Sequence, residues 1–189
     1  MADTDPEGGA HWAAPRRPPW GPVLVGMRGS GKSTVAPIVA RRLGLGWVDS
    51  DAELERREGQ TIPELFEKGE AHFRGLESRL LVELLQRPEI VLATGGGGVL
   101  HPPIRDLCAR RFTVWLDAPP PVLAQRIQGS SRPSLTERSL LDELRHLLVE
   151  RAPWYREAST LRIDVGTDSP ETVAERVADA WTLARSREG

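Results

Sequence analysis

The chain has 189 residues, 39% of them apolar, and its formal net charge is −2. That size suits one globular domain with a sizeable core, and the near balance of charge gives no electrostatic reason to expect a nucleic-acid or membrane partner. The single cysteine, Cys108, excludes an internal disulfide and a cysteine metal cluster, and it predicts a buried thiol in a reducing, cytoplasmic setting.

The N-terminal segment differs in composition from the rest of the chain. Residues 1–20 are polar and rich in proline, glycine and alanine, which predicts a disordered tail before a single domain at 21–189. The arginine pair at 16–17 is followed by prolines rather than by an apolar segment, so we expect no secretory signal. Because no apolar run reaches about 18 residues, we also expect no membrane span.

From residue 21 onward, short apolar runs alternate with segments of helical periodicity. In chain order, the pattern predicts a strand at 22–26, a helix at 33–43, a strand at 46–51, helices at 61–68 and 70–86, a strand at 89–94, a helix near 102–109, a strand at 111–117, helices at 120–128 and 139–151, and a strand at 161–165. A last helix follows, with Ser169 as its N-cap and Pro170 as its first residue. This alternation predicts a parallel sheet with helices on both faces.

Three polar or glycine-rich segments come directly after predicted strands, at 26–33, 49–51 and 94–98. Right-handed crossovers place the C-terminal ends of parallel strands along one edge of the sheet. Ligands bind at that edge in open α/β sheets, so the functional site is predicted there.

The segment "GMRGSGKS" at 26–33 matches the phosphate-binding pattern, with a predicted strand before it and a predicted helix after it. Its glycines let backbone N–H groups turn toward phosphate oxygens, and the helix points its positive end at the same anion. Lys32 is one of only two lysines among 25 lysines and arginines. A compact ammonium suits the β- and γ-phosphates better than a flat guanidinium, and Ser33 offers a hydroxyl to Mg²⁺. The segment predicts a bound nucleoside triphosphate, against the alternative of a glycine-rich turn with an exposed lysine.

Asp49 and Asp51 close the second predicted strand. Alternation along a strand would point both carboxylates to one side, where one could hold Mg²⁺ through water and the other could orient an attacking alcohol. An equally good alternative is that Asp-x-Asp marks the start of a helix.

Candidate cations for an acidic substrate follow. Arg74 and Glu77 are three residues apart on a predicted helix, so Glu77 can fix the guanidinium of Arg74. The alternative is a solvated surface pair. Arg151 is a further candidate, because an arginine grips both oxygens of a carboxylate.

Two further segments point to the same site. The run "TGGGG" at 94–98 bares backbone amides that a substrate can approach closely, against the alternative of a plain glycine-rich linker. Arg132 lies in an irregular segment, and such a loop can close over the nucleotide and bring a cation to the transferring phosphoryl group.

These motifs together resemble the shikimate kinase family. "GMRGSGKST", "DSD", "GEAHFRGLE", "ATGGGG", "SRPSL" and "ERAPWYREA" occur in that family's order and spacing, over about residues 22–183. The resemblance implies a three-layer P-loop fold with a five-stranded parallel sheet in the order 2-3-1-4-5 and a lid at about 129–138. It also implies transfer of the γ-phosphate of ATP to the 3-hydroxyl of shikimate, with Mg²⁺. We expect a monomer with no nucleic-acid or membrane partner.

The resemblance carries roles to particular residues. The ATP site would comprise Gly29, Ser30, Gly31, Lys32, Ser33, Thr34, Arg126 beside the adenine and Arg132, with Asp49 holding Mg²⁺ through water. The shikimate site would comprise Asp51, Arg74, Gly95, Gly96, Gly97 and Arg151, with Glu77 orienting Arg74. The catalytic residues would be Lys32, Asp51 and Arg132.

Some residues depart from the family pattern or have ordinary interpretations. Pro37 inside the first helix should kink or tighten it, Ser134 replaces a lid leucine, and Gly98 should loosen the loop after the glycines. His72 and His101 are expected in loops or on the surface, and Trp47 and Trp115 in the core. Two alternative functions remain at this point: a kinase for another hydroxy acid, such as quinate or gluconate, and a non-catalytic nucleotide-binding domain.

Overall fold

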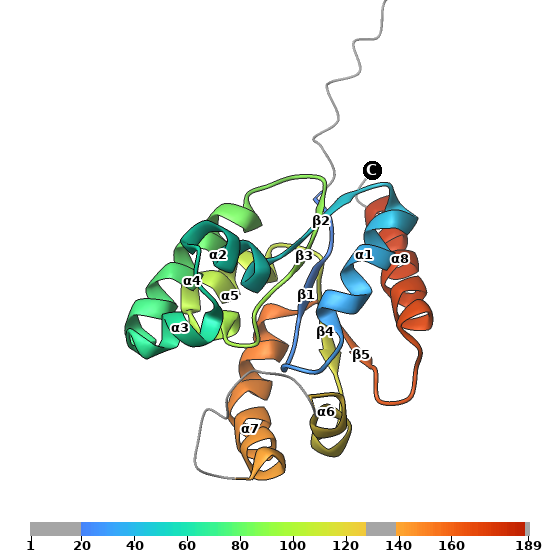
Figure 1. Cartoon of the computed structure of the whole chain (residues 1–189). Helices are drawn as coiled ribbons and strands as arrows, with labels where there is room; N and C mark the ends of the chain where they lie inside the picture. The colour runs from blue at the N-terminus through green and yellow to red at the C-terminus, as the bar shows by residue number, and fades with distance from the viewer. Residues whose placement is uncertain (1–19, 128–138, 188–189) are drawn as a thin grey trace, which may run out of the picture.

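The computed structural model describes residues 20–127 and 139–187 (Figure 1). The predicted lid, with Arg132 and Ser134, lies outside the described residues, as does the predicted tail up to residue 19. The strands are β1 (Val23–Val25), β2 (Gly46–Asp49), β3 (Ile90–Ala93), β4 (Thr113–Asp117) and β5 (Leu161–Asp164). The helices are α1 (Lys32–Leu43), α2 (Ser50–Glu58), α3 (Ile62–Glu67), α4 (Glu70–Leu85), the 3₁₀ turn η1 (Gly98–Leu100), α5 (Pro102–Ala109), α6 (Pro120–Ile127), α7 (Leu140–Ala158) and α8 (Pro170–Ser186).

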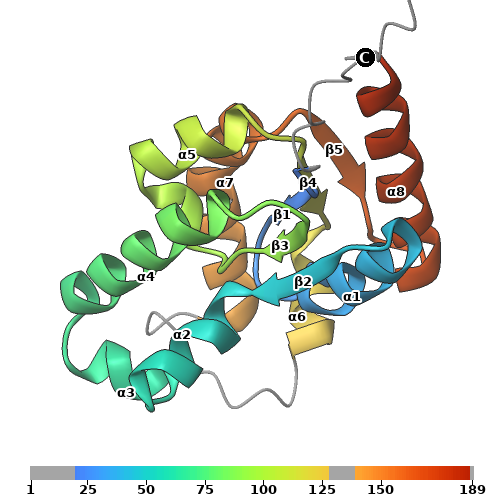
Figure 2. The same ribbon diagram turned by 90° about the horizontal axis from the view of Figure 1, so that it is seen from above.

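The strands form one parallel sheet in the order β2-β3-β1-β4-β5. Helices α1 and α8 cover one face, and α4, α5 and α7 cover the other, which gives three layers (Figures 1 and 2). This confirms the predicted fold and strand order. The C-terminal ends of the strands share one edge, so the phosphate-binding loop, the start of α2 and the glycines after β3 come together there.

Burial follows the position of each strand in the sheet. The central strand β1 is completely buried, and Trp115 in β4 is 3% exposed, as predicted for the core. The prediction for Trp47 is wrong: it is 48% exposed because β2 is an edge strand with a neighbour on one side only. Cys108 is buried as predicted, and burial raises the pKa of its thiol to about 12.

The segment at 46–51 does not remain a strand to its end. Asp49 is the N-cap of α2, and its Oδ1 accepts hydrogen bonds from the backbone N–H groups of Asp51 (2.9 Å) and Ala52 (3.2 Å). The alternation argument for the two carboxylates is therefore wrong, and the alternative of a helix start is correct. Helix α2 itself was not predicted, because its sequence is mostly charged and only Ser50 and Leu54 are buried.

Two prolines lie inside helices without ending them. Helix α1 runs unbroken past Pro37 to its C-cap Gly44, and α7 continues past Pro153 to Ala158, although the sequence pattern predicted its end at residue 151. In α7 the buried positions Leu144, Leu147, Arg151, Tyr155 and Ala158 keep one helical face. Packing of that face outweighs the lost backbone hydrogen bond.

Within residues 20–127 and 139–187, no helix combines the length and the apolar composition that a membrane span needs.

Candidate active site

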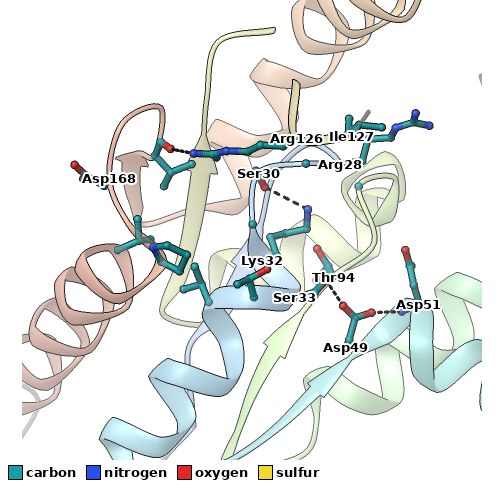
Figure 3. A pocket seen from close by; sticks show the side chains of 18 residues that line it. Arg28, Ser30, Lys32, Ser33, Asp49, Asp51, Thr94, Arg126, Ile127 and Asp168 are labelled. Carbon is teal, nitrogen blue, oxygen red and sulfur yellow. Dashed lines mark hydrogen bonds between the residues drawn. The ribbon is translucent and has the colours of Figure 1, made fainter. Parts of the chain in front are cut away.

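A cavity of about 470 Å³ lies over the phosphate-binding loop at the C-terminal edge of the sheet (Figure 3). Its lining is residues 28–35, Asp49, Asp51, Thr94, Gly96, Arg126, Ile127, Val165, Asp168, Pro170 and Val173. Figure 3 shows Lys32 in the middle of this cavity, with Arg126 at one end and Asp49 and Asp51 at the other. The predicted nucleotide-binding residues that the structure describes therefore share one cavity.

The side chain of Lys32 folds back over the loop. Its Nζ donates to the carbonyl oxygens of Gly26 and Met27, both at 2.8 Å, and lies 3.4 Å from Ser30 Oγ. Gly31, which precedes α1, has φ of +89°, a left-handed conformation that glycine adopts without strain. The ammonium and the N-terminus of α1 thus direct positive charge into the same space, as an anion site requires. The alternative of an exposed lysine in a plain turn is wrong.

Ser33 and Asp49 bring two oxygen ligands together beside Lys32. Ser33 Oγ donates to Asp49 Oδ2 at 2.5 Å, so the start of α1 and the end of β2 meet at this point. A hydroxyl and a carboxylate are hard oxygen donors of the kind that Mg²⁺ prefers. Within residues 20–127 and 139–187, no group of three or more acidic, histidine or cysteine side chains is arranged so that it could hold a metal ion by itself. The pair therefore fits an ion that takes most of its ligands from nucleotide and water.

Arg126 marks the end of the cavity away from Asp49 and Asp51 (Figure 3). Its Nη2 donates to the carbonyl of Val165 at 2.7 Å, which holds the flat guanidinium in place, and the apolar side chains of Val165, Pro170 and Val173 line the same cavity. A planar cation and apolar side chains in one cavity suit a nucleobase.

A second cavity, of about 280 Å³, adjoins the first. Its lining is Met27, Arg28, Asp51, Ile62, Pro63, Phe66, Phe73, Arg74, Glu77, Gly95, Gly96, Gly97, Leu147 and Arg151. Arg28, Asp51 and Gly96 line both cavities, so the two spaces meet at these residues. Asp51 therefore stands between the anion site and a second site that is lined by three arginines, Arg28, Arg74 and Arg151.

Arg74 is held by carboxylates and aromatic rings. Its Nη1 donates to Glu77 Oε2 at 2.7 Å, and its guanidinium lies 5.5 Å from the centroid of Phe66 and 5.1 Å from that of Phe73. Glu77 is 3% exposed, so the alternative of a solvated surface pair is wrong. Burial raises the pKa of Glu77, while Arg74 opposes that shift.

Arg151 faces the same cavity from α7 and is 8% exposed. Its Nη1 donates to the carbonyl of Gly96 at 3.3 Å. Its Nε is shielded from solvent and has no hydrogen-bond partner in the part of the chain that the structure describes. A buried guanidinium N–H group without a hydrogen-bond acceptor indicates an anionic ligand.

Comparison with known proteins identifies the family. The model of the shikimate kinase family matches residues 28–182. The shikimate kinase of Synechococcus sp. (strain CC9605) is 43% identical over 157 residues, which cover 82% of this chain and 78% of that protein. The shikimate kinase of Halorhodospira halophila is 41% identical over 174 residues, which cover 90% of this chain and 96% of that protein. The chain belongs to the shikimate kinase family. The solved shikimate kinase from Acinetobacter baumannii, in complex with shikimate, superposes with a TM-score of 0.83 at 36% identity, over 88% of this chain and 94% of that one.

As a member of the shikimate kinase family, the chain is an ATP-dependent small-molecule kinase. Two residues that were not predicted as site residues, Tyr155 and Ser50, hold the glycine segment that lines the cavities. Tyr155 is completely buried and donates from its hydroxyl to the carbonyl of Gly96 at 2.7 Å, and Ser50 Oγ accepts from the N–H of Gly95 at 2.8 Å. Tyr155 follows Arg151 by one helical turn, so the spacing could have revealed it had the helix been extended past Pro153. Nothing in the sequence marks Ser50 as a partner of Gly95.

The glycine segment after β3 is tightly packed in this shikimate kinase. A Cβ on Gly95 would lie 2.5 Å from Asp51 Oδ1 and 2.8 Å from Glu77 Oε1, and one on Gly97 would overlap the Arg74 guanidinium. The prediction that Gly98 loosens the loop is wrong: it begins η1, and its Cβ would lie 2.9 Å from Leu81. These glycines are required because charged or apolar side chains occupy the space beside them.

Gly97→Ala should therefore displace Arg74 while leaving the fold intact. The backbone of Gly97 has an ordinary φ of −95°, so alanine adds only the overlap with a long side chain. We expect KM for shikimate to rise about tenfold or more, equivalent to about 1.4 kcal/mol, with little change in thermal stability. Steady-state kinetics and thermal unfolding check this, with Gly46→Ala as the control because its added Cβ would meet ordinary contacts at 3.6 Å. Unchanged kinetics for Gly97→Ala would contradict the placement of Arg74.

Proposed function

We propose that this shikimate kinase transfers the γ-phosphate of ATP to the 3-hydroxyl of shikimate and releases shikimate 3-phosphate and ADP. The observation that supports this most directly is that an anion-binding cavity around Lys32 meets, at Asp51, a second cavity lined by Arg28, Arg74 and Arg151. A terminal phosphate and an alcohol could react at that junction.

In this proposal the first cavity binds ATP. The backbone at Gly29, Ser30, Gly31, Ser33 and Thr34 surrounds the phosphates, Lys32 contacts the β- and γ-oxygens, and Arg126 lies beside the adenine. The positive charge of Lys32 beside the γ-phosphate offsets the negative charge that develops on the transferring phosphoryl group. Arg132, outside the described residues, would add a second cation to that group from the lid.

Ser33 and Asp49 would hold Mg²⁺, Ser33 directly and Asp49 through water. The hydrogen bond between them places two hard oxygen donors side by side, and that donor chemistry fits such an ion. When bound, Mg²⁺ would neutralise charge on the β- and γ-phosphates.

The second cavity binds shikimate in this proposal. Arg74 and Arg151 hold the carboxylate, Glu77 keeps Arg74 oriented, and the backbone of 95–97 lines the ring. Asp51 accepts a hydrogen bond from the 3-hydroxyl, orients it for in-line attack and takes its proton as the new O–P bond forms. The buried Arg151 and the partly buried Arg74 select an acceptor with a carboxylate, because each planar guanidinium can donate two parallel hydrogen bonds to the two carboxylate oxygens.

The protein is proposed to act as a monomer in the cytoplasm. Residues of one chain line both cavities, and the buried, reduced thiol of Cys108 suits a reducing compartment.

A comparison of acceptors tests the proposal. ADP formation is measured with Mg-ATP and shikimate, quinate, gluconate or no acceptor. We expect kcat/KM for shikimate to exceed that for the other acids by roughly a hundredfold or more, because hydroxyl positions that do not match leave buried polar groups unpaired. Equal turnover of gluconate or quinate would overturn the choice of acceptor. Binding of Mg-ATP without shikimate-dependent ADP formation would instead favour a non-catalytic domain.

A further inference from the structure

His101 lies next to the second cavity but is not one of its lining residues. It occupies the junction between η1 and α5, and two prolines follow it. Arg105 Nη1 donates to the carbonyls of Val99 (2.8 Å) and Leu100 (3.2 Å), which immediately precede His101. His101 thus lies in a loop, as expected, and the backbone that carries its imidazole is held in place.

The Nε2 atom of His101 points toward the carboxylate that orients Arg74. This nitrogen is shielded from solvent, has no hydrogen-bond partner among the residues that the structure describes, and lies 3.9 Å from Glu77 Oε2. Arg74 Nη1 donates to the same oxygen at 2.7 Å. A carboxylate oxygen can accept more than one hydrogen bond, so His101 is placed as a second donor to Glu77.

Charges around the pair favour a neutral imidazole. Burial, Arg74 and Arg105 lower the pKa of His101. Burial raises the pKa of Glu77, as does Asp51, while Arg74 and Arg151 lower it. A neutral imidazole protonated at Nε2 can donate to Glu77 without adding another positive charge near Arg74 and Arg105.

We propose that His101 is a positioning residue for Arg74 that acts through Glu77, donating from Nε2 to Glu77 Oε2 when the substrate carboxylate draws Arg74 away from that oxygen. The proposal rests on the assignment of Arg74 to the shikimate carboxylate. A hydrogen bond of about 2.9 Å requires the two atoms to approach by roughly 1 Å.

This contact matters because Glu77 is buried. A buried, ionised carboxylate is destabilised when it loses a hydrogen-bond donor. Without a replacement donor, Glu77 would therefore retain Arg74 and hold it back from the substrate. With His101 as a replacement donor, Arg74 can turn to the substrate while Glu77 stays ionised and keeps its orientation. The carboxylate clamp thus includes a residue that does not touch the substrate.

The test compares three substitutions of His101 by steady-state kinetics and thermal unfolding. His101→Ala and His101→Leu remove the donor, and Leu also fills the space. His101→Gln supplies a neutral N–H at a similar reach. We expect KM for shikimate to rise about tenfold in the first two variants and to return to within about threefold of wild type in the Gln variant. The loss should fall on KM for shikimate more than on kcat, and KM for ATP should not change.

A second comparison isolates the route through Glu77. In a Glu77→Met background, His101→Leu should have no further effect on KM for shikimate, because position 77 then has no oxygen to accept the Nε2–H. His72→Ala is the matched control, since His72 is an exposed histidine on α4 and should leave the kinetics unchanged.

The outcomes separate the two proposals. An unchanged KM for shikimate in His101→Leu, an equal rise in the Glu77→Met background, or no rescue in His101→Gln would each overturn the role of His101. If the wild-type protein forms no ADP in response to shikimate, the proposed function itself fails, whatever the His101 variants show.

Discussion

Replacing Lys32 by methionine should lower kcat by roughly 10²- to 10³-fold, a loss of about 3–4 kcal/mol of transition-state stabilisation. Methionine retains an unbranched side chain but removes the ammonium that hydrogen-bonds the carbonyls of Gly26 and Met27. The loss should appear in kcat because the charge acts on the phosphoryl group as it transfers. Initial rates at saturating ATP and shikimate measure it.

The other lysine provides the control for this substitution. Lys68 is exposed, lies after α3 and donates to Gln60 Oε1 at 2.6 Å, away from both cavities. Lys68→Met should leave kcat and both KM values unchanged. If Lys32→Met retained the wild-type kcat, the phosphate-binding loop would not serve catalysis in this protein.

The phosphate-binding loop could be predicted from sequence because its determinants are local. Glycines with unusual backbone angles, a lysine and a helix N-terminus all lie within 26–33, between a strand and a helix. Similarly, alternating apolar runs and helical patterns predicted the parallel sheet, since every buried strand of this fold is short and continuous. Strand order came from the family resemblance, because crossover lengths alone allow several orders.

Asp49 and Asp51 show where local reasoning failed. The same residues suit the end of a strand and the start of a helix, and the capping hydrogen bonds of Asp49 decide between them. Capping satisfies backbone donors that would otherwise be unpaired, so it outweighs the continuation of an edge strand. The structure nevertheless brings Asp49 to Ser33 and leaves Asp51 between the cavities, although the geometric reason for expecting this was wrong.

The second cavity could be predicted only in part. Arg74 and Glu77 are neighbours on one helix, so their contact followed from spacing, whereas its burial depends on Phe66 and Phe73 packing beneath the guanidinium. The contacts of Tyr155 with Gly96 and of Ser50 with Gly95 join segments that are 59 and 45 residues apart. No local pattern encodes such contacts, because they depend on how completed elements pack.

Arg151→Ala should weaken shikimate binding by about 2–5 kcal/mol, which corresponds to a rise in KM of roughly 30- to 5,000-fold. The guanidinium is almost completely buried beside Asp51, Glu77 and Arg74, so solvent cannot replace it as the partner of a bound carboxylate. Tyr155 still donates to the carbonyl of Gly96 in this variant, and we therefore expect the glycine segment to keep its conformation. Shikimate saturation curves at fixed Mg-ATP measure the effect.

Two further variants determine whether charge or geometry carries the effect at Arg151. Arg151→Lys keeps the positive charge but loses the planar guanidinium that donates two hydrogen bonds to one carboxylate. Its KM for shikimate should therefore lie between those of wild type and Arg151→Ala. Arg145→Ala removes an exposed arginine of the same helix, which pairs with Asp142 at 3.2 Å, and should not alter KM. A wild-type KM in Arg151→Ala would remove this arginine from the carboxylate site, and full recovery with lysine would show that charge alone is recognised there. The predicted intermediate value for lysine follows from two contributions at one buried position, since Coulomb attraction survives the exchange and the paired hydrogen bonds do not.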